Sequence, residues 1–193
     1  MEKDLIKYEA AVKRFAQKKE EFEFSNKDNQ HASIVISTIL EYSQEVRLFV
    51  KNLDGSVTDI PNIVSISSNE SRFITALRLF IAAGKSIKIA VKEKNETDKE
   101  SKIYNFLMET AQRFPEQLEV KLATDSFIEN QKEGFTIAGP NIDFYYMVGD
   151  KTSFRINFNR DKHEATCNFN DKPVASQLTS NFDTNYPLCS AFF

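Results

Sequence analysis

Apolar residues recur three and four positions apart in several stretches of the sequence. This spacing places them on one side of a helix, and it predicts helices over about residues 4–19, 31–42, 68–83, 98–114 and 171–182. Other stretches are rich in β-branched and large apolar residues, which predicts strands over residues 45–51, 86–91 and 118–122. A shorter alternating run, residues 21–24, predicts one more strand.

Capping residues mark where some of the predicted helices begin and end. Ser67 with Glu70, and Thr97 with Glu100, have the Ser/Thr-x-x-Glu pattern of a capping box, which satisfies free backbone N–H groups at a helix start. Gly84 follows an apolar helical stretch, at the position where a left-handed residue commonly ends a helix. These signals separate the predicted helices from the elements around them.

The order of the predicted elements indicates the fold class. Residues 30–122 alternate helix and strand, which argues for parallel strands joined by right-handed crossovers. After Gly134 the strands follow one another without helices, over residues 135–138 and 141–170, until a closing helix begins near Pro173. We therefore predict an α/β fold with a mixed, mostly parallel sheet flanked by helices, a C-terminal antiparallel strand region and a closing helix.

The length of the chain predicts one domain over residues 1–193, with a substantial core. Within it, residues 1–20 form an N-terminal helix with a single apolar stripe, which packs on its own domain or on a partner. The tail, residues 186–193, is apolar for a chain end. We expect this tail to be docked, either on its own chain or across a dimer.

Composition narrows the classes of function. The net charge of −3 gives no general attraction to nucleic acid or to an anionic membrane, so nucleic-acid binding is a minor expectation. Cys167 and Cys189 are too few for a disulfide framework and too isolated for a zinc site, and no ligand set surrounds His31 or His163. We expect no metal and no cofactor. The absence of a signal-like or membrane-spanning apolar run predicts a cytoplasmic protein with no membrane partner.

The candidate site residues gather in the stretch 141–170, and they are Asp143, Tyr145, Asp150, Arg155, Asn157 and His163. The first five alternate along two adjoining predicted strands, so they can converge on a phosphate-sized pocket in which the Arg155 guanidinium binds an anion. Alternatively they are the solvent-facing positions of a hairpin whose other residues face inward, namely Phe144, Tyr146, Val148, Phe154 and Ile156. His163 is either a general base or nucleophile, or an exposed residue of a polar turn.

The order of elements resembles the phospholipase D superfamily over about residues 22–185. The resemblance includes the helical stretch NQHASIVISTILEYSQ leading into EVRLFVK, the helix that ends at Gly84 before SIKIAVK, and the strand-rich close ending in Asn168-Phe169-Asn170. The mark of that family is His-x-Lys-x4-Asp, with a nucleophilic histidine and a phosphate-binding lysine. The best register places Asp143 at the histidine, Tyr145 at the lysine and Asp150 at the aspartate. Only the aspartate is retained.

This resemblance implies a degenerate phosphodiesterase site, because Asp143 and Tyr145 cannot replace the imidazole and the ammonium group. We therefore expect a non-catalytic binding, scaffold or regulatory protein with a protein partner. Single-motif members of the family pair as homodimers, which implies a dimer with the hairpin region near its axis. The alternative is a phosphodiesterase or nuclease with His163 or Asp143 as nucleophile and Arg155 on the phosphate. Abundant Lys, Asn and Phe with few Gly are typical of an AT-rich bacterial genome.

Overall fold

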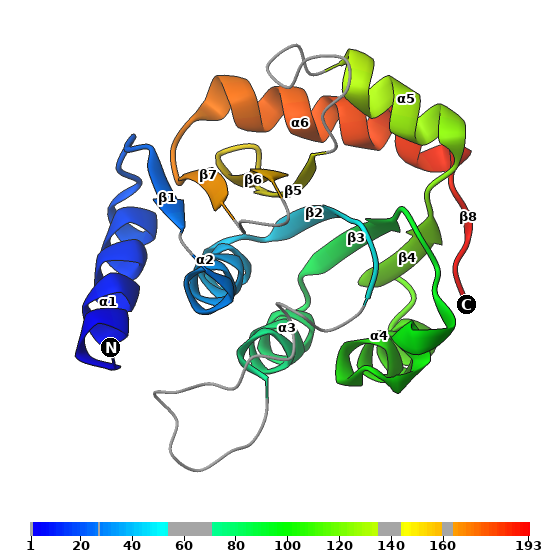
Figure 1. Ribbon diagram of the computed structural model, residues 1–193, viewed down its shortest axis with the longest axis horizontal. Helices are drawn as coiled ribbons and strands as arrows, with labels where there is room; N and C mark the ends of the chain where they lie inside the picture. Colours follow the sequence, from blue (N-terminus) through cyan, green and yellow to red (C-terminus); the bar gives the residue numbers. More distant parts are fainter. Residues whose placement is uncertain (1, 27, 54–70, 135–143, 160–163) are drawn as a thin grey trace.

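The computed structural model describes residues 2–26, 28–53, 71–134, 144–159 and 164–193 (Figure 1). The helices of these residues are α1 (Glu2–Lys18), α2 (Asn29–Tyr42), α3 (Arg72–Ala82), α4 (Lys102–Arg113), α5 (Asp125–Glu133) and α6 (Lys172–Asn185), with short 3-10 turns η1 (Glu96–Glu100) and η4 (Tyr186–Leu188). The strands are β1 (Phe24–Asn26), β2 (Glu45–Val50), β3 (Ser86–Val91), β4 (Leu118–Leu122), β5 (Tyr145–Gly149), β6 (Ser153–Asn159), β7 (Glu164–Asn168) and β8 (Ser190–Ala191).

All of the described strands belong to one sheet, in the order β1-β7-β6-β5-β2-β3-β4-β8. Only the pairs β2–β3 and β3–β4 are parallel. The pairs β1–β7, β7–β6, β6–β5, β5–β2 and β4–β8 are antiparallel. The sheet is mixed, as predicted, but the prediction that it is mostly parallel was wrong.

The reason lies in how the strands are connected. Helices α3 and α4 carry the chain from β2 to β3 and from β3 to β4, and such crossovers give parallel neighbours. The later strands β5, β6 and β7 follow one another through short connections, so each is antiparallel to the one before it. They attach beside β2, while β1 and β8 add an antiparallel strand at each edge. Local sequence signals predict each strand but not how many antiparallel pairs the sheet acquires.

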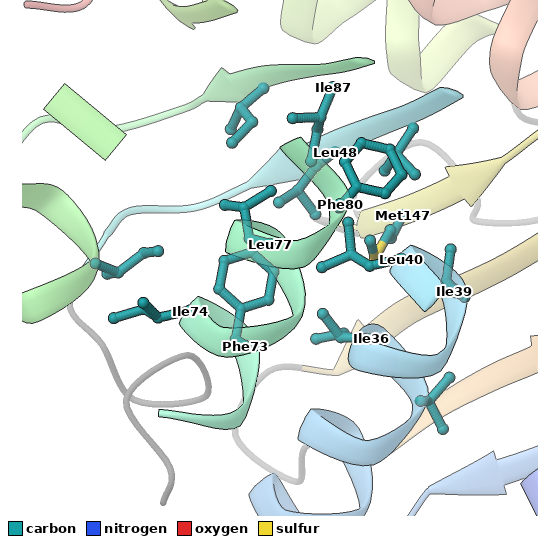
Figure 2. Close-up of a cluster of buried hydrophobic side chains, with 14 of the residues drawn as sticks. Ile36, Ile39, Leu40, Leu48, Phe73, Ile74, Leu77, Phe80, Ile87 and Met147 are labelled. Atoms are coloured by element: carbon teal, nitrogen blue, oxygen red, sulfur yellow. The ribbon is translucent and has the colours of Figure 1, made fainter. Parts of the chain in front are cut away.

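Helices cover both faces of the sheet (Figure 1). Helices α1, α2, α3 and α4 lie on one face, and α5 and α6 lie on the other. Figure 2 shows the core of the first face, where α2 and α3 direct apolar side chains at one another and at the strands. Labelled there are Ile36, Ile39, Leu40, Leu48, Phe73, Ile74, Leu77, Phe80, Ile87 and Met147. A second cluster joins the opposite face of the sheet to α5 and α6.

Helix α2 is the central helix of the first layer. Every residue from Ala32 to Leu40 is buried, because the sheet, α1 and α3 surround the helix. Gly149 of β5 permits the close approach of its C-terminal end. A Cβ atom at Gly149 would lie 2.1 Å from Ser43 Oγ and 3.0 Å from Ile39 Cγ2, so no larger residue fits without displacement.

The two predicted capping boxes have different outcomes. The box at Ser67 and Glu70 falls outside the described residues, and α3 begins after Ser71, whose Oγ accepts from the Ile74 N–H at 3.2 Å. The prediction that Thr97 caps the next helix was wrong. There, Asp98 accepts from the Asn95 N–H at 2.9 Å in the turn η1, and Ser101 caps α4.

The two ends of the chain lie against the rest of the molecule. Helix α1 packs on α2, with Leu5, Val12 and Ala16 buried in the first core cluster. At the other end, β8 pairs with the edge strand β4, and Phe192 is buried. The Lys94 ammonium group donates to the Phe192 carbonyl oxygen. None of the helices in the described part of the chain is long and apolar enough to cross a membrane.

Candidate functional site

The hairpin β5–β6 carries four of the six predicted site residues. Its register pairs Tyr145 with Asn157, Met147 with Arg155, and Gly149 with Ser153. Side chains alternate between the two faces of a strand, so Arg155 and Asn157 lie on the α2 side with Met147. The residues between them lie in the cluster under α6, as the sequence predicted: Phe144, Tyr146, Val148, Phe154 and Ile156.

Arg155 and Asn157 are buried, with only 7% and 8% of their surfaces exposed. The interpretation that these positions face solvent is therefore wrong for both, since α2 covers the face on which they lie. Arg155 lies between Met147 and Cys167 in the register of the sheet. Burial lowers the pKa of its guanidinium from the ordinary value, and the nearby Cys167 and Tyr8 oppose that shift. Arg155 is therefore a buried residue of the sheet interior.

Asp150 has a structural role at the far end of β5. It begins the hairpin turn with φ +51°, followed by Lys151 with φ +55°, as expected for a turn that left-handed residues close. Its Oδ1 accepts from the backbone N–H groups of Gln44 and Glu45, both at 2.8 Å. The Asp150 N–H donates in turn to the Glu45 carbonyl oxygen at 3.0 Å. The carboxylate thereby fixes the turn to the start of β2. Asp150 is five residues from Tyr145, which corresponds to about 16 Å along the strand at roughly 3.3 Å per residue.

We expect Asp150→Ala to lower the free energy of unfolding by about 2 kcal/mol, because two hydrogen bonds to a charged acceptor are lost. Asp150→Asn, which keeps an oxygen acceptor and tolerates the left-handed conformation, should lose about half as much. Urea denaturation of the two variants and the unaltered chain measures both losses. Equal stability of all three proteins would contradict the structural role of Asp150.

Tyr145 lies at the start of β5, beside the ends of the parallel strands. It is half-buried, and its ring centroid lies 5.5 Å from that of Phe49. A hollow beside it has a volume of about 10 Å³, which is the space of about one water molecule. The residues that line the hollow are Phe49, Lys92, Ile128, Gln131, Lys132, Phe144 and Tyr145. Two lysines and three aromatic rings thus surround this hollow, beside the position that the resemblance assigns to the phosphate-binding lysine.

Part of this lining was missed by the sequence analysis, because α5 was not predicted. Gln131 and Lys132 come from α5, which has Thr124 as its N-cap and Asp125 in its first turn. Thr124 before Asp125, with Phe127 and Gln131 four positions apart, is the signal that identifies this helix. Gln131 accepts a hydrogen bond from the Tyr146 hydroxyl at 2.7 Å, which fixes α5 to the hairpin.

The last two candidates and the other histidine, His31, remain to be placed. Asp143 and His163 lie outside the described residues. His31 lies at the start of α2, where its Nδ1 is 2.7 Å from Asp28 Oδ1 and its ring meets Tyr8 edge-on at 4.4 Å. Asp28 is the N-cap of α2 and accepts from the His31 N–H. Within the described ranges, no three His, Cys, Asp or Glu side chains are grouped so as to hold a metal ion.

Cys167 of β7, which pairs with Arg155 of the hairpin, makes the stability of the fold depend on pH. Burial raises the pKa of its thiol to about 12, although the nearby Arg155 lowers it in part. An unfolded thiol titrates near 8.5, so above that pH the unfolded chain loses a proton that the folded chain keeps. Stability is therefore fully present below about pH 8.5 and falls as the pH rises toward 12.

We expect the free energy of unfolding to fall more steeply between pH 8.5 and 10.5 in the unaltered chain than in Cys167→Ala, because the variant lacks this proton. Urea denaturation in the presence of a reductant, at several pH values, measures the two slopes. The absolute stability of the variant does not matter to the comparison. Identical slopes would show that Cys167 ionises alike in the folded and unfolded chains.

Comparisons with known proteins agree on the fold. The sequence matches no protein-family model and no curated protein. Among solved structures, the chain is similar to TrmBL2, an archaeal chromatin protein with a novel mode of DNA binding. The TM-score is 0.57 at 11% identity, covering 98% of this chain and 66% of TrmBL2.

The second similarity is to Nuc from Salmonella typhimurium, a phospholipase D family member. Here the TM-score is 0.55 at 10% identity, with 90% of this chain and 99% of Nuc covered. Identities this low establish the fold alone. The order and direction of the strands, the helices on both faces and these two structural similarities lead to one conclusion: the chain has a phospholipase D-like fold.

Proposed function

We propose that this chain is a non-catalytic phospholipase D-like domain that acts by binding, as a homodimeric scaffold or regulator of a protein partner. The observation that carries the proposal is the use made of the one retained motif residue. Asp150 is hydrogen-bonded to the backbone at the start of β2, which is a role in folding. The position that the motif gives to lysine holds Tyr145, whose ring packs against Phe49.

The surroundings of the hairpin support the same proposal. The hollow beside Tyr145 has a volume of about 10 Å³, too small for a phosphoryl group. Arg155 is the predicted phosphate ligand of the alternative enzyme. It is only 7% exposed and lies on the face of the sheet that α2 covers. A nucleophile and a cation must meet at one phosphate in any phosphodiesterase. The burial of Arg155 and the small size of this hollow therefore support a role in binding.

The test of the non-catalytic role is turnover of bis(p-nitrophenyl) phosphate and of single-stranded DNA by the purified chain. We expect no release of product above the protein-free rate. His163→Ala and Asp143→Ala serve as the decisive variants, since the alternative assigns the nucleophile to one of them. Turnover that either variant abolishes would replace this proposal by a phosphodiesterase.

The homodimer is tested by light scattering coupled to gel filtration over a range of concentrations. We expect a mass of twice the 22.2 kDa of one chain. A monomer at high concentration would contradict the dimer.

DNA is the second ligand class to test, because TrmBL2 is described as DNA-binding. Affinity for duplex DNA that falls steeply with salt would replace the protein partner by nucleic acid.

A further inference from the structure

A groove between α1 and α3, with α2 as its floor, is large enough for a small molecule. Its volume is about 390 Å³, within the roughly 300–1,000 Å³ typical of ligand-sized cavities. The three helices that line it lie on the opposite face of the sheet from α5 and α6 (Figure 1). The groove is therefore separate from the Tyr145 hollow, which α5 helps to line.

Most of the charged groups that line the groove are paired with one another. The Arg72 guanidinium donates to both carboxylate oxygens of Glu9, at 2.8 and 3.1 Å. The Lys13 ammonium group lies 3.5 Å from Glu9 and 3.2 Å from the Glu41 carboxylate. These two cations and two carboxylates neutralise one another, so none of them calls for a charged ligand.

Lys85 is the charge in this groove that the chain leaves unbalanced. Its ammonium group donates to the Glu41 backbone carbonyl oxygen at 3.1 Å and lies 5.3 Å from the centre of the Phe80 ring. Both of these partners are uncharged, and among the described residues Lys85 has no carboxylate partner. An ammonium group has three donors, so donors remain for an anion that enters the groove.

The floor of the groove contains a buried hydroxyl group without a protein partner. Ser37 of α2 lines the groove and is 8% exposed, and its Oγ has no hydrogen-bond partner among the described residues. The neighbouring Thr38 hydroxyl, in contrast, donates to the Ile34 carbonyl oxygen at 2.8 Å. A buried hydroxyl that lacks a partner destabilises the fold, and a polar atom of a ligand can supply that partner.

The position of these two polar groups sets the size of a matching ligand. Ser37 precedes Glu41, whose carbonyl oxygen Lys85 contacts, by four residues of α2, or about 6 Å at roughly 1.5 Å per residue. The wall of the groove that α3 contributes is largely apolar and includes Ala76 and Leu79, of which Leu79 is 67% exposed. A matching ligand therefore has an anionic group, an apolar body and a second polar group about 6 Å from the first.

We propose that the groove between α1 and α3 binds a small organic monocarboxylate that carries a second polar group. The carboxylate pairs with Lys85, the apolar body covers Leu79, and the second polar group forms a hydrogen bond with the Ser37 hydroxyl. One negative charge balances the one unpaired cation, whereas a dianion such as a phosphate monoester brings a second charge that Glu9 and Glu41 repel. The site requires neither the proposed homodimer nor the proposed protein partner.

The test titrates nitrogen-15 labelled chain with four matched compounds and follows the amide chemical shifts. The compounds are p-hydroxybenzoate, benzoate without the hydroxyl group, p-hydroxybenzamide without the charge, and p-hydroxybenzylamine with the opposite charge. We expect p-hydroxybenzoate to bind most tightly and to shift the amides of Ser37, Glu41 and Leu79. Benzoate should bind about fivefold more weakly and the benzamide at least about tenfold more weakly, because each lacks one of the two hydrogen-bonding groups. The amine should cause no saturable shift.

Three variants assign the two contacts. Lys85→Met keeps the methylene groups beside Phe80, and it should weaken p-hydroxybenzoate about tenfold while it changes the affinity for p-hydroxybenzamide less than about twofold. Ser37→Ala should remove the preference for p-hydroxybenzoate over benzoate and leave the affinity for benzoate unchanged. Lys88→Met is the matched control, because Lys88 of the same strand β3 lies 5.6 Å from the Tyr186 ring, outside the groove, and it should leave all affinities unchanged. The amide spectra establish that each variant is folded.

Each contrary result overturns a stated part of this inference. The absence of saturable shifts at the groove with both carboxylates overturns the site, and so do shifts centred on Phe49 and Lys92 beside the Tyr145 hollow. Binding that Lys85→Met leaves unchanged overturns the pairing with the carboxylate. Equal affinity of the unaltered chain for p-hydroxybenzoate and benzoate overturns the role of Ser37. None of these results bears on the turnover and light-scattering tests of the proposed function, which succeed or fail separately.

Discussion

Replacing Phe182 by alanine should lower the free energy of unfolding by about 4 kcal/mol, the range found for deleting a buried aromatic ring. Phe182 of α6 is fully buried and is the central ring of the second core cluster. It meets Phe127 and Tyr146 edge-on, with centroids 5.7 and 6.3 Å away, and stacks on Tyr186 at 5.0 Å. Urea denaturation followed by circular dichroism measures the loss.

Phe22→Ala is the matched control for this prediction. Phe22 is 53% exposed, and its main ring contact is with Phe15 at 5.2 Å. Its removal should cost less than about 1 kcal/mol, because much of its surface is already in water. Losses of similar size in the two variants would mean that α6 does not form a packed layer on the hairpin.

The elements with strong local signals were predictable from the sequence. Strand β3 occupies Ser86–Val91, as the run of Ile and Val residues predicts, and α6 begins at its cap Asp171 with Pro173 in the first turn. Gly84 has φ +75° and its N–H donates to the Ile81 carbonyl oxygen, as a helix-ending glycine should. The weaker run at residues 21–24 was misplaced, since β1 occupies Phe24–Asn26.

The burial of the hairpin was not predictable in the same way. The alternation rule assigns one face of an antiparallel hairpin to solvent, and that holds only where a single layer covers the sheet. Here α2 covers one face of β5–β6 and α6 covers the other, so Arg155 and Asn157 are buried beside Met147. Which helix returns over which strand depends on contacts between distant parts of the chain. No local pattern contains that information.

Two residues at positions that the resemblance assigns to the motif have structural contacts in this fold. Asp150, at the position that the resemblance assigns to the motif aspartate, joins the hairpin turn to β2 through two hydrogen bonds. Tyr145, at the position that the resemblance assigns to lysine, packs against Phe49. A group with a structural role is costly to lose even when nothing is hydrolysed. The hydrogen bonds of Asp150 to the backbone are therefore enough to explain an aspartate at this position.

The second large effect on the free energy of unfolding is expected at the ion pair between Arg47 of β2 and Asp183 of α6. Arg47 donates from Nε and Nη2 to the two carboxylate oxygens of Asp183 in α6, at 3.0 and 2.8 Å, and from Nη1 to Glu45 at 2.9 Å. Its side chain is only 12% exposed. Burial lowers the pKa of Arg47, but the hydrogen bonds to Asp183 and Glu45 outweigh that effect and raise it above the ordinary value. The folded chain thus stabilises the protonated form of Arg47 relative to the same side chain in water.

We expect Arg47→Ala to lower the free energy of unfolding by about 3 kcal/mol, because three charge-assisted hydrogen bonds are lost and Asp183 keeps a partly buried charge without its partner. Arg47→Lys should recover less than about half of this, since a lysine cannot make the two-pronged contact. Glu45→Ala should cost less than about 1 kcal/mol, because Glu45 is 58% exposed and water replaces it. Urea denaturation at neutral pH ranks the three variants.

A double-mutant cycle with Asp183→Ala decides whether the pair itself carries the effect. If Arg47 acts mainly through Asp183, the doubly substituted chain should be more stable than the sum of the single losses allows, by about 2 kcal/mol. Additive losses would instead assign the cost of Arg47→Ala to lost packing of its methylene groups against the sheet. The cycle tests how firmly α6 is joined to the central strand. That join matters to the fold because α6 covers one face of the hairpin, and the side chains between them form the second core cluster.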